Sequence, residues 1–482
     1  MKWSRGRWIV FLVVIALAIL VGIRFWSYFS AAMPLGYDPG MYRAFFLSLQ
    51  NQLPYIHLSQ LPLWIQSTYE PLSGILYIVT HNIIGLSPDM ALLRGVGILH
   101  ILISLFMYLL LRKYSTITAL LGVLLYLSSV IQYQVFWRGY LKQMLGVLFI
   151  LTAYYLIEKK SYRLLIPILT ALFTVNRAGG LFFLLSYLLY KLVVGIKHTS
   201  RTWNDVWSLL IAAGLSVVVY RPLMRIQIFD FFSPMFGQAF LGEASGTFFD
   251  KSTYMIYNII LIALSIFGCI VGWSRSFIKK IPLELIGFAI GILWVGFQLF
   301  FYNRMLGYFD IFVIILAAYG LSFLLLHSKK IWKLLGIGLY ILQLVFFIFY
   351  VQRTSFPLMI AKEFKTIQEI PRFIKTDAKI MVTGRKYSSF LMGYASRRII
   401  APGLFDRDPW TATEWNTRHL SDGLKKCQML NMLKEKERPS YLWIGSLQPF
   451  EQLSGADCLQ QLRGDDSYGF YLVKYGNAKI NN

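Results

Sequence analysis

The chain has 482 residues, of which 57% are hydrophobic and only 15% are charged. Soluble domains carry closer to about 25% charged residues, so this composition excludes an ordinary soluble protein and indicates that lipid is the main solvent. The net charge is +24. Because the basic residues stand in short clusters between apolar runs, membrane topology explains this charge, and nucleic acid is not an expected partner.

Apolar segments long enough to cross a membrane recur along most of the chain. A spanning helix needs about 20 mostly apolar residues. The stretch 162–196 is too long for one span, and Asn176, Arg177 and Gly179–Gly180 interrupt it, so we predict two short helices that meet at this break. The other predicted spans are 8–29, 92–111, 117–136, 143–157, 206–223, 254–273, 282–302, 305–326 and 331–351.

The basic clusters predict the orientation of these spans. The first segment begins MKWSRGRW and no small-residue cleavage site follows it, which indicates an uncleaved anchor with a cytoplasmic N-terminus. Clusters at 112–113, 159–163, 197–201, 275–280 and 329–333 then fall in every second loop.

All of these clusters are cytoplasmic only if the ambiguous apolar segment 72–87 lies on the surface or is re-entrant. We therefore predict about 11 spans in a plasma membrane, with the C-terminus outside. If 72–87 does cross, every basic cluster lies outside instead.

Two regions are expected outside the membrane, the loop 30–91 and a soluble domain at 355–482 that follows the membrane domain 1–354. In the soluble domain we predict helices at 361–374, 387–396 and 449–462, a Trp-rich loop and a helix within 406–437, and strands at 378–384, 398–403, 440–446 and 468–476. This alternation predicts a small α/β domain. The fold class is thus a mainly α, polytopic membrane bundle with a C-terminal soluble α/β domain. Cys427 and Cys458 can pair if that domain is extracytoplasmic.

Two carboxylates stand at informative places in the first external loop. Asp38, in GYDPGMYR, follows the first span, and Glu70, in STYEPLSG, precedes the segment 72–87. The simpler interpretations are a loop Asp that caps a helix beginning at Pro39 and a Glu that faces lipid headgroups. Tyr42, Arg43 and Tyr69 flank the two acids and are candidates for binding a sugar or an acceptor, although tyrosines there also suit an interfacial aromatic belt.

Four basic residues break the charge rule because they lie in very short loops on the external side. They are Arg138 and Lys142 in FWRGYLKQ, Arg177 in VNRAGG and Arg304 in FYNRMLGY. Each one alone can extend to the outer headgroups. As a set on one face they predict a site for a lipid-linked phosphate, which arginine binds through two oxygens.

These features together resemble the GT-C glycosyltransferases, which transfer sugars from polyprenyl-phosphate donors. The resemblance covers most of 1–350: an external loop with an acid (Asp38), the stretch Glu70-Pro71-Leu72, the run ALLRGVGILHILISLFMYLLLRKYS, and FYNRMLGYFDIFVIILAAYGL with a donor-binding Arg (Arg304). The second Pro of the family stretch is Leu72 here, and WRGYLK has no acid. That departure implies a metal-independent member similar to the protein mannosyltransferases and aminoarabinose transferases, or a divergent, inactive one.

The resemblance implies an inverting transfer from a polyprenyl-phosphate-linked sugar to a hydroxyl of a glycan, lipid or protein acceptor. Asp38 is then the base, Glu70 orients the acceptor or a cation, and Arg304 with Arg138, Lys142 or Arg177 stabilises the leaving phosphate. No cofactor is expected and no metal is supported.

Two other classes stay open. One is a lipid-linked oligosaccharide polymerase or ligase, and the other is a transporter of lipid or polysaccharide. Transporters often carry acids at mid-membrane, and the one near candidate here, Asp310, is expected at the interface. The LFDRDPWTATEW stretch of the soluble domain suits glycan stacking or, alternatively, core packing by Trp410 and Trp415.

Overall fold

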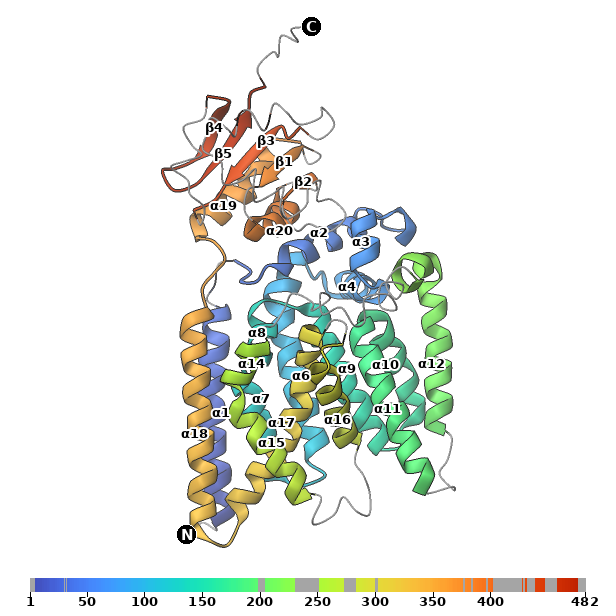
Figure 1. The fold of residues 1–482 in the computed structure, drawn as a ribbon. Coiled ribbons are helices and arrows are strands. Elements are labelled where there is room, and N and C mark those ends of the chain that lie inside the picture. The colour runs from blue at the N-terminus through green and yellow to red at the C-terminus, as the bar shows by residue number, and fades with distance from the viewer. Residues whose placement is uncertain are drawn as a thin grey trace.

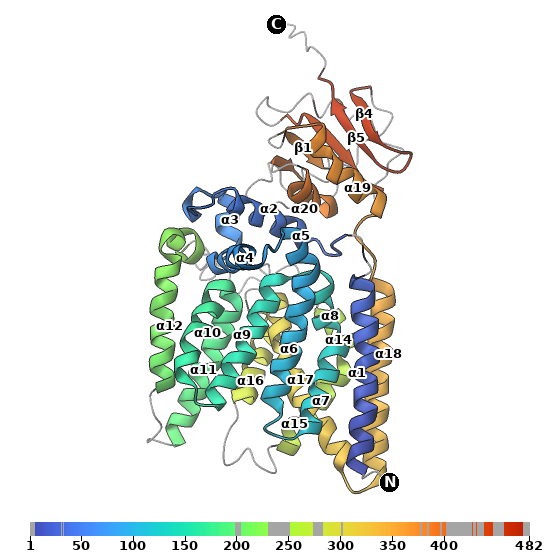
Figure 2. The same cartoon turned by 180° about the vertical axis from the view of Figure 1, so that it is seen from behind.

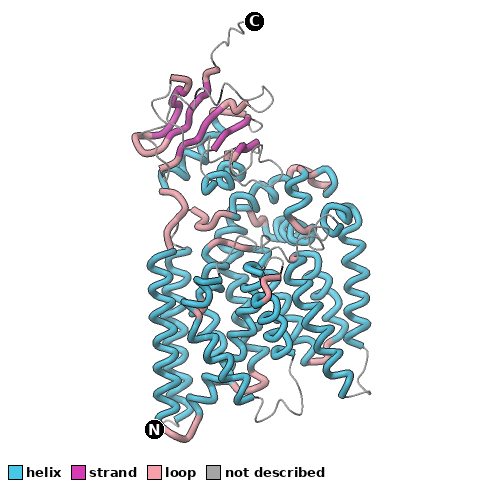
Figure 3. Tube along the Cα trace, viewed as in Figure 1, coloured by secondary structure: helices cyan, strands magenta, loops and turns pink. Residues whose placement is uncertain are grey.

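The helices form an elongated bundle with a small sheet-containing domain at one end, and the N-terminus lies at the opposite end (Figure 1). The computed structural model describes residues 5–29, 31, 33–197, 204–229, 251–272, 283–299, 302–375, 378–382, 385–395, 398–401, 427, 430, 438–446 and 457–475. All strands lie in the end domain, and helices make up the rest (Figure 3). The predicted fold class is therefore confirmed.

Every predicted span coincides with a helix or a bent pair of helices. The bundle helices are α1 (Arg5–Phe29), α6 (Val96–Leu111), α7 (Thr116–Ser128), α8 (Val130–Trp137), α9 (Leu141–Glu158), α10 (Tyr162–Val175), α11 (Arg177–Lys197), α12 (Asn204–Tyr220), α14 (Lys251–Tyr257), α15 (Ile259–Gly272), α16 (Leu283–Gly296), α17 (Tyr302–Leu326) and α18 (Lys330–Thr354). Within the described residues, five helices are long and apolar enough to cross a membrane, or seven if α7–α8 and α14–α15 each form one bent span. The total of 11 crossings stays a prediction.

Helix α17 is the centre of the bundle and carries Arg304 in its first turn. It packs on α15, α16 and α7, and 78% of its most apolar stretch is buried. Glycines allow the closest of these contacts: a Cβ on Gly268 of α15 would lie 2.1 Å from the carbonyl oxygen of Leu316 in α17. Helices α1 and α18 run side by side along one flank in both views (Figures 1 and 2).

Short helices cover the end of the bundle that faces the C-terminal domain. They are α2 (Asp38–Gln50), η1 (Leu58–Gln60), α3 (Leu63–Thr68), α4 (Pro71–Ile84) and α5 (Pro88–Met90), which continues through η2 (Ala91–Gly95) into α6, together with η3 (Arg221–Leu223) and η4 (Arg225–Phe229). Helix α4 has 14 residues and stops at Gly85, whose φ of 65° is the left-handed conformation that ends many helices. It lies at this end in both views rather than along the bundle axis, as a non-crossing segment 72–87 requires.

The C-terminal domain is a five-stranded sheet with helices on it. The strands β1 (Lys379–Val382), β2 (Arg398–Ile400), β3 (Tyr441–Ile444), β4 (Leu459–Gly464) and β5 (Gly469–Val473) follow the order β2-β1-β3-β5-β4. β1 is parallel to both neighbours, and β5 is antiparallel to β3 and β4. The helices are α19 (Ala361–Glu369), η6 (Ile370–Arg372) and α20 (Arg385–Tyr394).

One predicted element of this domain is wrong. Residues 459–464 form the strand β4 and not the end of a helix over 449–462. The Leu-Gln-Gln-Leu run has good helix propensity, but the turn after Gly464 pairs it with β5, and this tertiary pairing overrides the local preference. Most of the predicted loop and helix within 406–437, including Trp410 and Trp415, lies outside the described residues.

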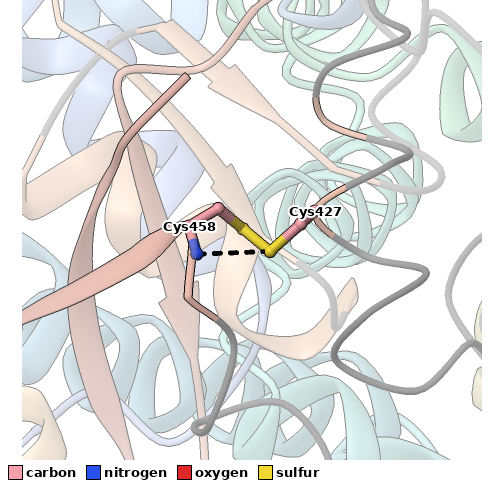
Figure 4. The surroundings of a disulfide bond; sticks show 2 residues. All are labelled: Cys427 and Cys458. Carbon is pink, nitrogen blue, oxygen red and sulfur yellow. Dashed lines mark hydrogen bonds between the residues drawn. A yellow bond between two sulfur atoms is a disulfide. The ribbon is translucent and has the colours of Figure 1, made fainter. Parts of the chain in front are cut away.

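A disulfide joins Cys427 to Cys458, which precedes β4 (Figure 4). The backbone N–H of Cys458 also donates a hydrogen bond to Sγ of Cys427, with an N to Sγ distance of 3.3 Å. The pairing that the sequence left open is thus formed in this fold. The disulfide therefore fixes Cys427 next to the start of the edge strand β4.

Candidate active site

A pocket lies beneath α2, at the end of the bundle that faces the C-terminal domain, and six of the nine predicted site residues line it. These are Asp38, Tyr42, Glu70, Lys142, Arg177 and Arg304. They come from α2, from the residue before α4, and from the first turns of α9, α11 and α17. Tyr140, Gln143, Asn176 and Ala178 complete the lining, and we had not predicted them as site residues.

Helix α2 directs Asp38 and Tyr42 into the pocket from two successive turns. The helix begins at Asp38, with Pro39 in its first turn, so Asp38 does not cap a helix that begins at Pro39. Residues four apart lie on one face of a helix, which places the Tyr42 ring beside the carboxylate. Gly36 brings the chain close to α8, because a Cβ there would lie 1.8 Å from the carbonyl oxygen of Arg138.

The Glu70 carboxylate is held between two cations. Its Oε2 lies 2.9 Å from Nζ of Lys142, and its Oε1 lies 3.2 Å from Nε of Arg177. Burial alone would raise the pKa of Glu70, but the charges of Lys142 and Arg177 outweigh it and hold the pKa below its ordinary value. Glu70 is therefore ionised and already engaged, which makes it a poor proton acceptor and a good holder of both cations.

The Asp38 carboxylate is in the opposite situation. It forms no ion pair with any residue that the structure describes. Burial raises the pKa of Asp38 to about 6, although the charges of Lys142, Arg304 and Arg138 act against this rise. A carboxylate that titrates near neutral pH suits general-base chemistry. The two acids of the pocket thus differ in their surroundings and in what they can do.

The break between α10 and α11 positions the cations. Asn176 is extended there, with φ −150° and ψ 98°. Its Nδ2 donates to the carbonyl oxygen of Lys142 at 2.9 Å, and its Oδ1 accepts from the N–H of Gly179 at 2.9 Å, which caps the start of α11. This break is the interruption that the sequence shows within 162–196. The junction of α10 and α11 therefore places Lys142 and Arg177.

Gln227, in η4, is a positioning residue that the sequence did not reveal. Its carbonyl oxygen accepts from Nη1 of Arg177 at 2.6 Å, and its Nε2 donates to the carbonyl oxygen of Tyr69 at 3.0 Å. Nζ of Lys142 donates to the carbonyl oxygen of Thr68 at 2.7 Å. Main-chain oxygens therefore orient both cations in addition to Glu70.

The three other predicted residues lie beside the pocket or away from it. Arg138 borders it, and its Nη1 donates to the Tyr140 hydroxyl at 3.4 Å. The ring of Tyr69 meets that of Tyr42 edge-on, with centroids 5.0 Å apart, behind the pocket wall. Arg43 lies on α2 but pairs with Asp89, its Nε 3.0 Å from Oδ1. Across the described ranges, no group of three His, Cys, Asp or Glu side chains can hold a metal ion.

We expected Asp310 at the membrane interface, but it is buried inside the bundle. Its Oδ2 accepts hydrogen bonds from Oγ of Ser129 at 2.6 Å and from Nε2 of Gln132 at 3.0 Å. Ser129 is the break between α7 and α8, and the buried Arg24 donates there to the carbonyl oxygens of Tyr126 and Leu127. The Arg24 bonds satisfy backbone carbonyls that the bend leaves open. Asp310 holds the side chains of Ser129 and Gln132 at the same bend, which is a structural role.

The fold of the chain resembles that of solved proteins, although neither a protein-family model nor a curated protein sequence matches the chain. ArnT from Cupriavidus metallidurans bound to undecaprenyl phosphate aligns with a TM-score of 0.57 and 12% identity over 97% of this chain and 98% of that one. Its apo state gives 0.56 and 13% over the same shares.

The Archaeoglobus fulgidus oligosaccharyltransferase, in complex with Zn and sulfate, aligns with a TM-score of 0.54 and 14% identity over 80% of this chain. The alignment covers 61% of the oligosaccharyltransferase, so the present chain spans less than two thirds of that enzyme. At these identities the likeness concerns the fold. The chain shares the overall fold of these two solved proteins, in agreement with the fold that the resemblance implies.

Proposed function

We propose that the protein is a membrane glycosyltransferase that moves a sugar from a polyprenyl monophosphate to a hydroxyl acceptor at the outer face. One observation carries this proposal: a single pocket holds a carboxylate without an ion pair, Asp38, beside a cluster of cations. An acid–base group facing a phosphate-sized cationic site is the minimum that such a transfer needs.

The charges of the site support a monophosphate-linked donor. Lys142, Arg177 and Arg304 line the pocket and Arg138 borders it, against the carboxylates Asp38 and Glu70. The excess is two positive charges. A sugar phosphodiester carries one negative charge and the released monophosphate up to two, so the site stabilises the leaving group more strongly than the donor.

In the proposed reaction, the acceptor oxygen attacks the anomeric carbon from the side opposite the phosphate. The new glycosidic bond forms as the bond between that carbon and the phosphate oxygen breaks, so the configuration inverts. The proton of the hydroxyl goes to Asp38, and polyprenyl phosphate leaves with the bonding electrons towards Arg304, Lys142 and Arg177. Tyr42 lies beside Asp38 and is placed to contact the acceptor or the sugar. Glu70 keeps the cations in place.

Two further observations support an external position of the pocket and a lipid-linked donor. The disulfide of the C-terminal domain suits an oxidising, extracytoplasmic compartment. The ArnT structure that aligns over nearly the whole chain is described as bound to undecaprenyl phosphate, a lipid monophosphate. We therefore propose an external pocket and C-terminal domain, a cytoplasmic N-terminus, a lipid-linked sugar as donor, and a glycan, lipid or protein as acceptor.

The proposal is tested by turnover in proteoliposomes with two sets of donors. Sugars linked to polyprenyl monophosphate should release polyprenyl monophosphate, measured by chromatography of the labelled lipid. Turnover confined to diphosphate-linked donors would instead identify a polymerase or ligase. Movement of intact lipid without bond cleavage would identify a transporter, a class that the structural role of Asp310 already disfavours.

The pH dependence of transfer should report Asp38. The base acts as a carboxylate, and burial raises its pKa to about 6. The value of kcat/KM, which reports the free enzyme, should therefore fall about tenfold for each pH unit below 6 and level off above it. A profile with its acidic limb near pH 4 would mean that the acting carboxylate is not the buried Asp38.

Glu70→Gln should separate a positioning role from a catalytic one. Lys142 and Arg177 lose their shared counter-charge, so the unfolding free energy should drop by about 3 kcal/mol and the transfer rate by about tenfold. The acidic limb of the pH profile should stay near 6 because Asp38 is intact. Thermal unfolding and pH–rate profiles measure both effects, and loss of the acidic limb would assign the base to Glu70.

A further inference from the structure

The C-terminal domain rests directly on α2, the helix that carries Asp38 and Tyr42 (Figure 2). Helix α20 of that domain packs on α2 with backbone against backbone. A Cβ on Gly40 would lie 2.1 Å from the carbonyl oxygen of Ser389, and a Cβ on Gly393 would lie 2.2 Å from that of Gly40. No other residue type fits at either position without moving the helices apart.

A ring of polar contacts around Arg43 joins α2, α5 and α20. Nε and Nη2 of Arg43 bind the two carboxylate oxygens of Asp89 at 3.0 and 3.4 Å, and Nη1 donates to the carbonyl oxygen of Gly393 at 2.5 Å. The Arg43 guanidinium lies 4.3 Å from the ring centroid of Tyr394, whose hydroxyl donates to Asp89 at 2.9 Å. The ring thus fixes α2 to the start of α6 and to the C-terminal domain together.

These contacts bracket the pocket residues along α2. Tyr37, just before Asp38, bonds the buried Ser388 of α20 at 2.8 Å, and Arg43 directly follows Tyr42. At about 3.6 residues per turn, Gly40 and Arg43 lie on roughly the opposite face of α2 from Asp38 and Tyr42. One face of the helix therefore meets the C-terminal domain while the other forms part of the pocket.

We propose that the C-terminal domain belongs to the active site: through Gly393 and the ring of Arg43, Asp89 and Tyr394, it holds α2 so that Asp38 and Tyr42 stay in the pocket. Arg43 is then a positioning residue, not a ligand of sugar or acceptor. The phosphate site is separate, because Lys142, Arg177 and Arg304 lie on α9, α11 and α17. This inference rests on the proposed function only for its kinetic consequence.

The position of α2 can be measured without any substrate. Asp38→Cys, in the full-length chain with Cys269→Ser, is treated in proteoliposomes with a membrane-impermeant thiol reagent. Arg43→Gln removes the polar contacts of Arg43 with Asp89 and Tyr394, and Gly393→Ala forces α2 and α20 apart. Arg43→Gln should raise the modification rate about tenfold, as expected for the loss of one hydrogen bond to a charged group. Gly393→Ala should raise it in the same direction, because the added methyl group would meet the backbone of Gly40. One variant removes a side chain and the other adds a methyl group, so one that fails to fold leaves the other informative.

Lys362→Gln is the matched control. It removes an exposed ion pair of the same domain, with Lys362 Nζ 2.6 Å from Asp465, and should leave the modification rate unchanged. If both Arg43→Gln and Gly393→Ala also modify at the control rate, α20 does not position α2 and the proposal is wrong. That result is independent of turnover, so it is distinguishable from failure of the glycosyltransferase proposal.

With Asp38 intact, the kinetic consequence follows. Arg43→Gln should lower kcat about tenfold, whereas the affinity for polyprenyl phosphate should change less than about twofold, because the phosphate-binding cations are on other helices. Arg43→Lys keeps the pair with Asp89 but loses the forked geometry, so it should restore part of kcat. An equal loss of lipid affinity and kcat would indicate a merely structural role for this contact.

Discussion

Asp38→Asn is expected to lower the rate of sugar transfer about 10³-fold, the typical contribution of a general base. The amide has the size of the carboxylate but cannot take the acceptor proton. Binding of polyprenyl phosphate should be unchanged or slightly tighter, because the change removes a negative charge from a pocket lined by Lys142, Arg177 and Arg304. Turnover at saturating donor and lipid binding by tryptophan fluorescence measure the two effects separately.

The control for this experiment is Asp465→Asn, which changes an acid on the exposed side of the C-terminal domain. It should transfer sugar at the normal rate. Normal transfer by Asp38→Asn would show that another group accepts the proton. Loss of lipid binding in the same variant would show that Asp38 shapes the phosphate site instead of acting on the acceptor.

Arg304→Gln should reduce kcat by about 10²- to 10³-fold, the cost of removing one group that stabilises charge in the transition state. Arg304 lines the pocket from the first turn of α17, which is the most buried of the long apolar helices among the described residues, so packing holds its position. The affinity for polyprenyl phosphate should fall as well, since the product carries the charge that the guanidinium binds. Arg304→Lys keeps the charge without the fork and should recover only part of the rate.

Arg353→Gln is the matched control for Arg304. Arg353 lies exposed in the last turn of α18, on the flank of the bundle, so this variant removes the same charge away from the pocket. It should leave kcat and lipid affinity unaltered. Full activity of Arg304→Gln would leave Lys142 and Arg177 as the whole phosphate site.

Much of the fold follows from features that are local in sequence. Runs of apolar residues predict the bundle helices, and the interruption at Asn176 predicts the break between α10 and α11. That Asp38, Glu70 and the four cations lie on one face of the protein was predicted less directly. That prediction used the rule that basic loops lie on the cytoplasmic side. That rule makes the four exceptions visible. Five of the six residues line one pocket, and the sixth, Arg138, borders it.

The parts of the fold and of the site that the sequence does not predict depend on contacts between residues far apart in the chain, which one sequence does not reveal. Glu70 and Arg177 are 107 residues apart, and Arg43 and Gly393 are 350 apart. Gln227 acts through its main-chain oxygen, for which the residue type is no guide. The strand β4 has a sequence that suits a helix, and only its partner β5 decides its conformation. Arg43 has the residue type of a ligand and faces a neighbouring domain instead.

Glu70 has a consequence for the end of the catalytic cycle. Polyprenyl phosphate leaves the proposed reaction with up to two negative charges, and without Glu70 only Asp38 would oppose the four cations that hold it. Between turnovers Glu70 lies 2.9 Å from Lys142 and 3.2 Å from Arg177, so it competes with the product for both cations. In the proposed reaction, this resident carboxylate therefore limits product inhibition.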